Sequence, residues 1–191
     1  MTTSPLRIAG LCGSLRKASY NRLALEAAGS LMPAGMELSV LDIRGFPMFD
    51  ADVLAEGMPT AVRKVREAVR GADAVLIASP EYNFSVSGVL KNAIDWISRG
   101  DDQPFAGKPV AILSATQGPL GGARSQYDLR KIMVFLDALV LNKPEVFIGM
   151  APGKFDAAGA LADAPTREIL GRQMAALQAF VQFVRRGRTQ S

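Results

Sequence analysis

The sequence predicts an α/β protein in which a doubly wound parallel sheet carries helices on both faces. Three observations predict this fold. Short β-type segments alternate with segments of helical periodicity along the 191 residues. Two β-type segments, Ala74–Ser79 and Val110–Leu113, are almost wholly apolar, which is typical of strands in the middle of such a sheet. No repeat, linker or low-complexity tract interrupts the pattern, so residues 1–191 are expected to form a single domain.

The expected strands are short apolar runs that end at turn residues. The first ends at Cys12 and Gly13, and the second is half polar, which suits the edge of a sheet. The five expected strands, in chain order, are Leu6–Leu11, Met36–Leu41, Ala74–Ser79, Val110–Thr116 and Glu145–Ile148.

The expected helices have apolar side chains that recur three or four positions apart. They are Asn21–Met32, Pro59–Arg70, Ser87–Ser98, Ala123–Leu139 and Pro165–Arg185. The first is expected to bury a face made of Leu23, Ala27, Ala28 and Leu31. The second is expected to bury Val62, Val65 and Val69 and to leave in solvent Arg63, Lys64, Arg66 and Glu67. The last is expected to bury Leu170, Met174, Leu177, Val181 and Val184.

The composition excludes several classes of enzyme. The chain has no histidine, which rules out imidazole-dependent hydrolase triads, Cys–His proteases and most catalytic zinc sites. Its single cysteine cannot form an internal disulfide, which indicates a reducing compartment. Neither a secretory signal nor an apolar run of ~20 residues is found, so a cytoplasmic protein is expected. The reactive group is therefore expected to be a bound cofactor, with no metal and no catalytic side chain.

In a doubly wound sheet, ligands bind beyond the carboxyl ends of the strands. The loop after the first strand, Gly13–Asn21, offers hydroxyls, basic groups and backbone N–H groups at a helix N-terminus, which suits a phosphate monoester. The alternative is an ordinary capped turn with Arg16 and Lys17 in solvent. The dinucleotide and P-loop glycine patterns are absent. Cys12 is expected to be a buried packing residue rather than a nucleophile.

The loops after the third and fourth strands complete the candidate site. Residues 79–88 place Tyr82 and Phe84 at the end of a central strand, where they suit a flat heterocycle or simply cover the end of the sheet. Residues 114–124 contain three glycines, which let backbone approach a ligand closely, although a mobile loop has the same composition. Arg124 stands behind these glycines and is suited to stabilise negative charge on a ligand.

These three segments resemble the flavodoxin-like, NAD(P)H-dependent FMN reductases, and within them the bacterial quinone and chromate reductases. The resemblance rests on LCGSLRKASYN (Leu11–Asn21), SPEYNFSVSGVLKNAIDW (Ser79–Trp96) and SATQGPLGGARSQYDLR (Ser114–Arg130). It extends from about Arg7 to Met150, and the terminal helix fits too. It implies a flavodoxin-like five-stranded sheet of order 2-1-3-4-5 and bound FMN.

The resemblance also implies which residues hold FMN. The phosphate would be held by the first loop, through Gly13, Ser14, Arg16, Ser19, Tyr20 and Asn21. The isoalloxazine ring would be lined, chiefly by backbone groups, by Pro80, Glu81, Tyr82 and Asn83. The third loop would touch the flavin through Thr116, with Ser114 and Gln117 as neighbours, and the choice of hydroxyl stays open. Relatives often carry proline at the position of Ser87, so this loop is expected to be less rigid here.

The implied activity is the reduction of quinones, and of chromate or other acceptors, by NADH or NADPH. A flavin takes hydride at its own N5, so the protein binds and tunes it, and ping-pong kinetics are expected. The alternative is a flavodoxin-type electron carrier, against which the net charge of +4 argues, because such carriers are typically acidic. A nucleotide-binding module without redox chemistry is a second alternative.

The remaining expectations concern partners. The basic clusters Arg63–Arg70 and Arg185–Arg188 are interpreted as a solvated helix face and a frayed tail, so neither nucleic acid nor a membrane is expected as a partner. Arg16, Arg99 and Arg124 are hypothesised to attract anionic acceptors such as chromate. One helix has apolar residues on two sides, with Leu129, Ile132, Met133 and Leu136 on one and Val134, Phe135 and Ala138 on the other. The second side predicts a homodimer or homotetramer.

Overall fold

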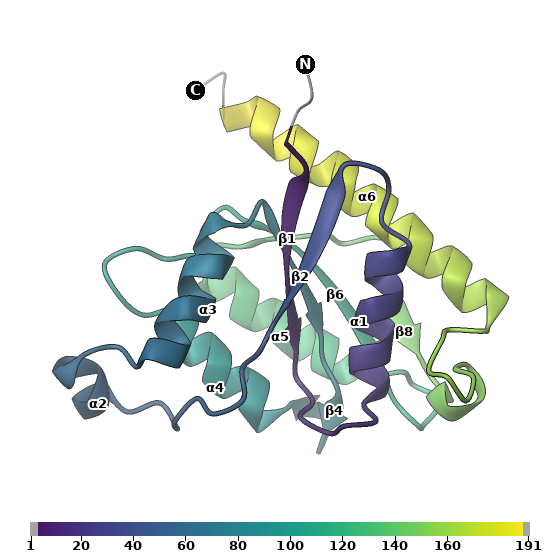
Figure 1. The fold of residues 1–191 in the computed structure, drawn as a ribbon, viewed down its shortest axis with the longest axis horizontal. Coiled ribbons are helices and arrows are strands. Elements are labelled where there is room, and N and C mark those ends of the chain that lie inside the picture. The colour runs from purple at the N-terminus through teal and green to yellow at the C-terminus, as the bar shows by residue number, and fades with distance from the viewer. Residues whose placement is uncertain (1–3, 189–191) are drawn as a thin grey trace.

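The computed structural model describes residues 4–188, which form a parallel sheet between two layers of helices (Figure 1). The strand order is β2-β1-β3-β6, and the fifth position is shared by β7 and β8, which both pair with β6. The predicted fold class and strand order are confirmed. The strands of this sheet are β1 (Leu6–Cys12), β2 (Met36–Leu41), β3 (Ala74–Ala78), β6 (Pro109–Ala115), β7 (Leu139–Val140) and β8 (Val146–Ile148).

The helices divide between the two faces of the sheet. α1 and α6 cover one face, and α3, α4 and α5 cover the other (Figure 1). The helices are α1 (Tyr20–Ser30), α2 (Ala51–Glu56), α3 (Thr60–Gly71), α4 (Gly88–Ile97), α5 (Ala123–Phe135) and α6 (Ala164–Arg188). A 3-10 turn, η1, spans Ala151–Gly153. No helix in the described part of the chain is long and apolar enough to cross a membrane.

Alternation along the strands supplies both hydrophobic cores. In β3, Leu76 packs on the side of α1 and α6, while its neighbours Val75 and Ile77 pack on the side of α3, α4 and α5. All five residues of β3 and all seven of β6 are buried, as expected for central strands. The half-polar strand β2 lies at the edge.

The buried face of α1 differs from the expected one. Ala24, Leu25 and Ala28 are fully buried, whereas Leu23, Ala27 and Leu31 are only partly buried. Ala24, Leu25 and Ala28 belong to the core between α1 and the sheet, whereas Leu23 lies to the side, against Gly159 in the loop before α6. The buried face of α6 is as predicted for Leu170, Met174, Leu177 and Val181, whereas Val184 is only partly buried.

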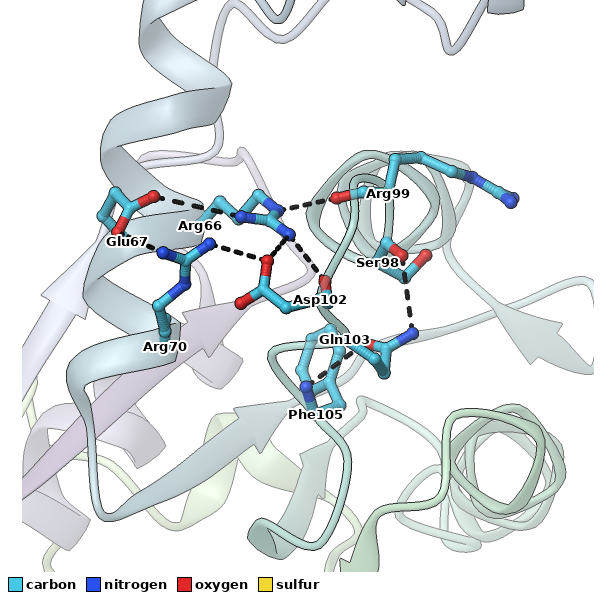
Figure 2. A network of polar contacts seen from close by, with 8 residues as sticks. All are labelled: Arg66, Glu67, Arg70, Ser98, Arg99, Asp102, Gln103 and Phe105. Carbon is cyan, nitrogen blue, oxygen red and sulfur yellow. Dashed lines mark hydrogen bonds and ion pairs between the residues drawn. The ribbon is translucent and has the colours of Figure 1, made fainter.

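Arg66 in α3 was expected in solvent but is only 5% exposed. Its guanidinium crosses to the loop after α4 and donates to the carbonyl of Arg99 (2.7 Å) and to the carbonyl and carboxylate of Asp102 (2.6 and 2.5 Å; Figure 2). Arg70, one turn later, donates to the same carboxylate (2.7 Å). These hydrogen bonds hold the pKa of Asp102 below its usual range, with the bond from Arg66 as the main cause. Arg66 therefore fastens the loop that leads into β6. The valines of α3 are buried as predicted.

Three segments differ from the sequence-based prediction. α5 ends at Phe135 rather than Leu139, because Asp137 has a left-handed backbone (φ 54°) and Leu139 and Val140 then pair with β6. The segment after β3 forms a small antiparallel hairpin, β4 (Glu81–Tyr82) and β5 (Ser85–Val86), which was not predicted. The short helix α2, capped by Asp50, was not predicted either.

Asp73, between α3 and β3, ties the start of β1 to the end of α6. Its carboxylate accepts from the backbone N–H of Arg7 (2.8 Å) and pairs with the guanidinium of Arg185 (2.6 Å). The beginning of β1 and the last turns of α6 therefore lie together at the amino edge of the sheet, opposite the edge at which the candidate site lies. Arg185–Arg188, expected as a frayed tail, thus belong to the end of α6, where Arg185 bonds to Asp73 and Arg188 to the Gly107 carbonyl.

Candidate functional site

A cavity of about 300 Å³ lies beyond the carboxyl ends of β1, β3 and β6, where the three predicted loops meet. Ten predicted site residues line it: Ser14, Arg16, Ser19, Tyr20, Asn21, Pro80, Glu81, Tyr82, Thr116 and Gln117. Ala115 and Gly118 line it as well and were not predicted. Gly13, Asn83 and Ser114 were predicted but do not line the cavity.

The first loop brings positive charge and a helix N-terminus to the cavity. Ser19 is the N-cap of α1, and its hydroxyl accepts from the backbone N–H of Arg22 (3.3 Å). The guanidinium of Arg16 lies 5.7 Å from the ring centre of Tyr20, and both side chains line the cavity. A helix N-terminus beside an arginine favours an anion, and a phosphate group above all.

Asn21 joins the first loop to the third. Its side-chain amide donates to the carbonyl of Ala115 (2.8 Å), and its side-chain oxygen accepts from the N–H of the same residue (2.9 Å). The side chain thus bonds the start of α1 to the end of β6 across 94 positions of sequence. Asn21 is only 4% exposed, so its main contribution to the site is to fix the distance between two loops.

Gly13 and Ser87 lie beneath the cavity. A Cβ at Gly13 would lie 2.9 Å from Pro80 and 3.0 Å from the Ser87 hydroxyl, so only glycine fits between the first two loops. The Ser87 hydroxyl donates to the Gly13 carbonyl (2.7 Å) and, as N-cap of α4, accepts from the N–H of Leu90 (3.4 Å). Ser87 is 1% exposed. It therefore fastens the loop that was expected to be less rigid.

The second loop forms one wall of the cavity. Pro80, Glu81 and Tyr82 line it, and the hairpin then turns through Asn83 and Phe84, both of which have a left-handed backbone (φ 48° and 68°). Asn83 lies in this turn rather than in the lining. The Glu81 side chain bonds to the first turn of α5 instead of a group in the cavity.

In the third loop, Thr116 is the predicted hydroxyl that lines the cavity, where it also donates to the Gly118 carbonyl (3.1 Å). Ser114 is fully buried beneath the loop. Its hydroxyl donates to the Gly121 carbonyl (2.5 Å) and accepts from the Gln126 amide (2.7 Å). A buried hydroxyl with both partners satisfied supports the loop and does not face a ligand.

Of the three arginines expected near the ligand, only Arg16 lines the cavity. Arg124 pairs with Glu81, and Arg99 lies after α4 with its guanidinium 4.8 Å from the Phe49 ring centre. Cys12 is buried, and this burial raises the pKa of its thiol, which suits a packing residue. Within residues 4–188, no group of three or more acidic or cysteine side chains is arranged to hold a metal.

The groups around the cavity fit FMN. A phosphate monoester matches the hydroxyls, arginine and helix N-terminus of the first loop. A flat ring matches the wall formed by Pro80 and Tyr82 and the backbone of the third loop. These groups suit binding and orientation of a reactive cofactor.

Known proteins are similar to this chain over nearly all of its length. The model of the NADPH-dependent FMN reductase family matches residues 6–153. An NAD(P)H-dependent FMN reductase of Pseudomonas aeruginosa is 52% identical over 180 residues, covering 94% of this chain and 97% of that protein. A quinone reductase of Escherichia coli is 48% identical over 183 residues, with the same two coverages. The solved flavoenzyme NAD(P)H:(acceptor) oxidoreductase FerB of Paracoccus denitrificans has a TM-score of 0.83 and 30% identity, and covers 95% of this chain and 98% of its own.

Proposed function

The chain belongs to the NADPH-dependent FMN reductase family, and on this premise we propose that it reduces quinones in a ping-pong reaction. It is an oxidoreductase whose cofactor is FMN and whose hydride donor is NAD(P)H. The observation that carries the proposal is the convergence of three separate loops on one cavity with an anion-binding end and an aromatic wall.

The chain's own residues would bind and orient the cofactor. Ser14, Arg16 and the N-terminus of α1 would hold the phosphate, while Pro80, Tyr82 and Thr116 would border the ring. Bound FMN supplies reversible hydride transfer at N5 of its ring. The only carboxylate in the lining, Glu81, is bonded to α5, so the lining is suited to hold the ring rather than to move protons.

The experiment that tests this function is an anaerobic titration of the FMN-loaded protein with NADH and NADPH. We expect the flavin absorption band near ~450 nm to bleach and to return when a quinone is added. Parallel lines in double-reciprocal plots at several quinone concentrations would support the ping-pong order. A flavodoxin-type carrier would show almost no steady-state turnover, and a band that no nicotinamide bleaches would refute the proposal.

We further propose that chromate is an acceptor, drawn by the charge of Arg16 at the cavity. Attraction of an anion weakens as salt screens it over about 10 Å at 0.1 M ionic strength. Turnover of chromate should therefore fall steeply with added salt, whereas turnover of a neutral quinone should not. Equal salt dependence of the two acceptors would refute the role of charge.

We also propose that residues 1–191 act as one domain in a cytoplasmic homodimer or homotetramer. The exposed side of α5 supports association, because Val134 and Phe135 are 75% and 86% exposed there. Tyr127, on the same helix, is 52% exposed. Light scattering should give the mass of a dimer or tetramer at micromolar concentration, and Phe135→Glu should lower it. A monomer at that concentration would refute the proposal.

A further inference from the structure

Glu81 lines the cavity but directs its carboxylate to another element. One carboxylate oxygen accepts from the backbone N–H groups of Arg124 (3.1 Å) and Ser125 (3.3 Å), and the other accepts from Nε of Arg124 (2.7 Å). A second guanidinium nitrogen of Arg124 completes the ion pair. The Glu81 side chain is only 8% exposed, compared with 40% for Arg124. A carboxylate with this many partners is fixed in one orientation.

The first turn of α5 depends on this carboxylate. Its N-cap residue, Gly122, has a left-handed backbone (φ 84°) and no side chain to cap the helix. The first turn also contains no acidic residue that would favour the positive end of the helix. Glu81, from a hairpin 43 positions earlier, supplies both the hydrogen bonds and the negative charge.

The same residues also bond the hairpin to α5. β4 and β5 have two residues each, and a two-stranded hairpin is at best marginally stable by itself. Its turn residue Phe84 is 66% exposed, with the Arg124 guanidinium 3.5 Å from its ring centre. Arg124 therefore bonds to the hairpin at its base, through Glu81, and at its tip, through Phe84.

We propose that Glu81 is a positioning residue of the reductase, which sets both the place of the Tyr82 wall and the charge at the rim of the cavity, where Arg124 stands behind the lining residue Glu81 without lining the cavity itself. It fixes the hairpin by capping α5. It also neutralises Arg124, whose ion pair with Glu81 is the only one it makes in the described chain. An acceptor that approaches on the hairpin side consequently meets no net charge from Arg124, and Arg16 remains the cation that lines the cavity. This role rests on the proposed function.

Hydrogen exchange tests the positioning role without any assay of activity. The wild-type chain, Glu81→Gln and Arg124→Met are compared, free and saturated with FMN, by mass spectrometry of the segments 81–86 and 123–126. Both variants should exchange faster in both segments, because each variant removes one side of the same contact. Glu168→Gln is the matched control, since it breaks a carboxylate–arginine pair (3.8 Å to Arg172) on α6. Faster exchange in only one of the two segments would overturn the clamp.

Acceptor kinetics test the charge at the rim. The probes are a neutral naphthoquinone and the same naphthoquinone carrying one sulfonate. Glu81→Gln frees the charge of Arg124 and should lower KM for the anion relative to the neutral quinone by about two- to fivefold. Arg124→Met removes the cation and leaves the Glu81 carboxylate with its backbone N–H donors only, and should raise KM for the anion relative to the neutral quinone. If both variants change the KM of the anion relative to that of the neutral quinone in the same direction, loosening of the hairpin alone explains the change. That result would overturn the proposed role of charge.

The two experiments separate this inference from the proposed function. If the wild-type protein does not transfer hydride from NAD(P)H to a quinone, the proposed function fails, and hydrogen exchange still decides whether Glu81 holds the hairpin. If the wild type is active and exchange in Glu81→Gln equals that of the control, the inference fails and the function stands.

Discussion

Replacing Asn21 by alanine should both destabilise the protein and weaken FMN binding. The substitution removes the two hydrogen bonds (2.8 and 2.9 Å) that join α1 to the end of β6, and it leaves the N–H and carbonyl of Ala115 without this partner. An orphaned buried polar group costs about 1–3 kcal/mol. Water in the adjacent cavity would partly replace the lost hydrogen bonds to the N–H and carbonyl of Ala115. We therefore expect a loss of roughly 2–4 kcal/mol in the free energy of unfolding.

The assays for Asn21→Ala are thermal unfolding without FMN, since bound FMN would add its own stabilisation, and fluorescence titration with FMN. In a chain of this size the expected loss corresponds to a fall in Tm of about 4–16 °C. The Kd for FMN should rise about tenfold or more, because the first and third loops would no longer be held at one distance. The control is Asn142→Ala, an exposed residue with a single bond from Arg130 (3.2 Å), which should change stability by less than about 0.5 kcal/mol. A Tm within 2 °C of the wild type (about 0.5–1 kcal/mol) and an unchanged Kd would refute the reasoning.

Three further outcomes are expected. Ser87→Ala removes the cap of α4 and the bond to the Gly13 carbonyl. It should lower the free energy of unfolding by about 1–2 kcal/mol in urea titrations and weaken FMN binding. An unchanged free energy of unfolding and an unchanged Kd for FMN would count against the role of Ser87 under the cavity. Arg66→Met should lower the free energy of unfolding by about 3 kcal/mol yet leave kcat for quinone unchanged, because Arg66 bonds to the loop that leads into β6, away from the cavity. Lys64→Met, on the exposed side of the same helix, is the control and should lower it by less than about 0.5 kcal/mol. Asp163 accepts hydrogen bonds from the hydroxyl and the N–H of Thr166 in the first turn of α6, and these bonds lower its pKa from 3.8. Its contribution to the free energy of unfolding is therefore present above pH 3.8 and is lost as the pH falls through the lower, folded value. Asp163→Asn should flatten the acid side of the curve of stability against pH, and an unaltered curve would contradict this assignment.

The sequence predicts the sheet well because each long strand is a continuous apolar or alternating run that can be recognised from neighbouring residues alone. Met36–Leu41 is the same in sequence and structure, and the buried strands β3 and β6 differ from expectation by a residue or so. The candidate cavity is also largely predictable, since parallel strands must bring their carboxyl ends to one edge. The hairpin was missed because its strands of two residues have no readable period.

The sequence is least informative about side chains whose partners are distant in sequence. Arg66 has the spacing of an exposed helix residue, and only the carbonyl groups 33 and 36 positions later explain its burial. Ser114 and Thr116 have similar hydroxyls, so the sequence leaves open which one contacts a ligand. The bonds of Ser114 to Gly121 and Gln126 show that its hydroxyl points into the protein and not into the cavity. Glu81 is predicted to line the site chiefly through its backbone, and the sequence does not show that its carboxylate bonds to α5.

The bonds of Asp73 to Arg7 and Arg185 have a practical consequence for handling this enzyme. Because they gather the beginning of β1 and the last turns of α6 at the edge away from the cavity, an affinity tag, a fusion partner or a surface linker attached after α6 would extend away from the cavity. A film of the protein anchored on an electrode in this way would present its redox-active side to the solution. Such a film would allow acceptors to be compared electrochemically, with no obstruction from the anchor.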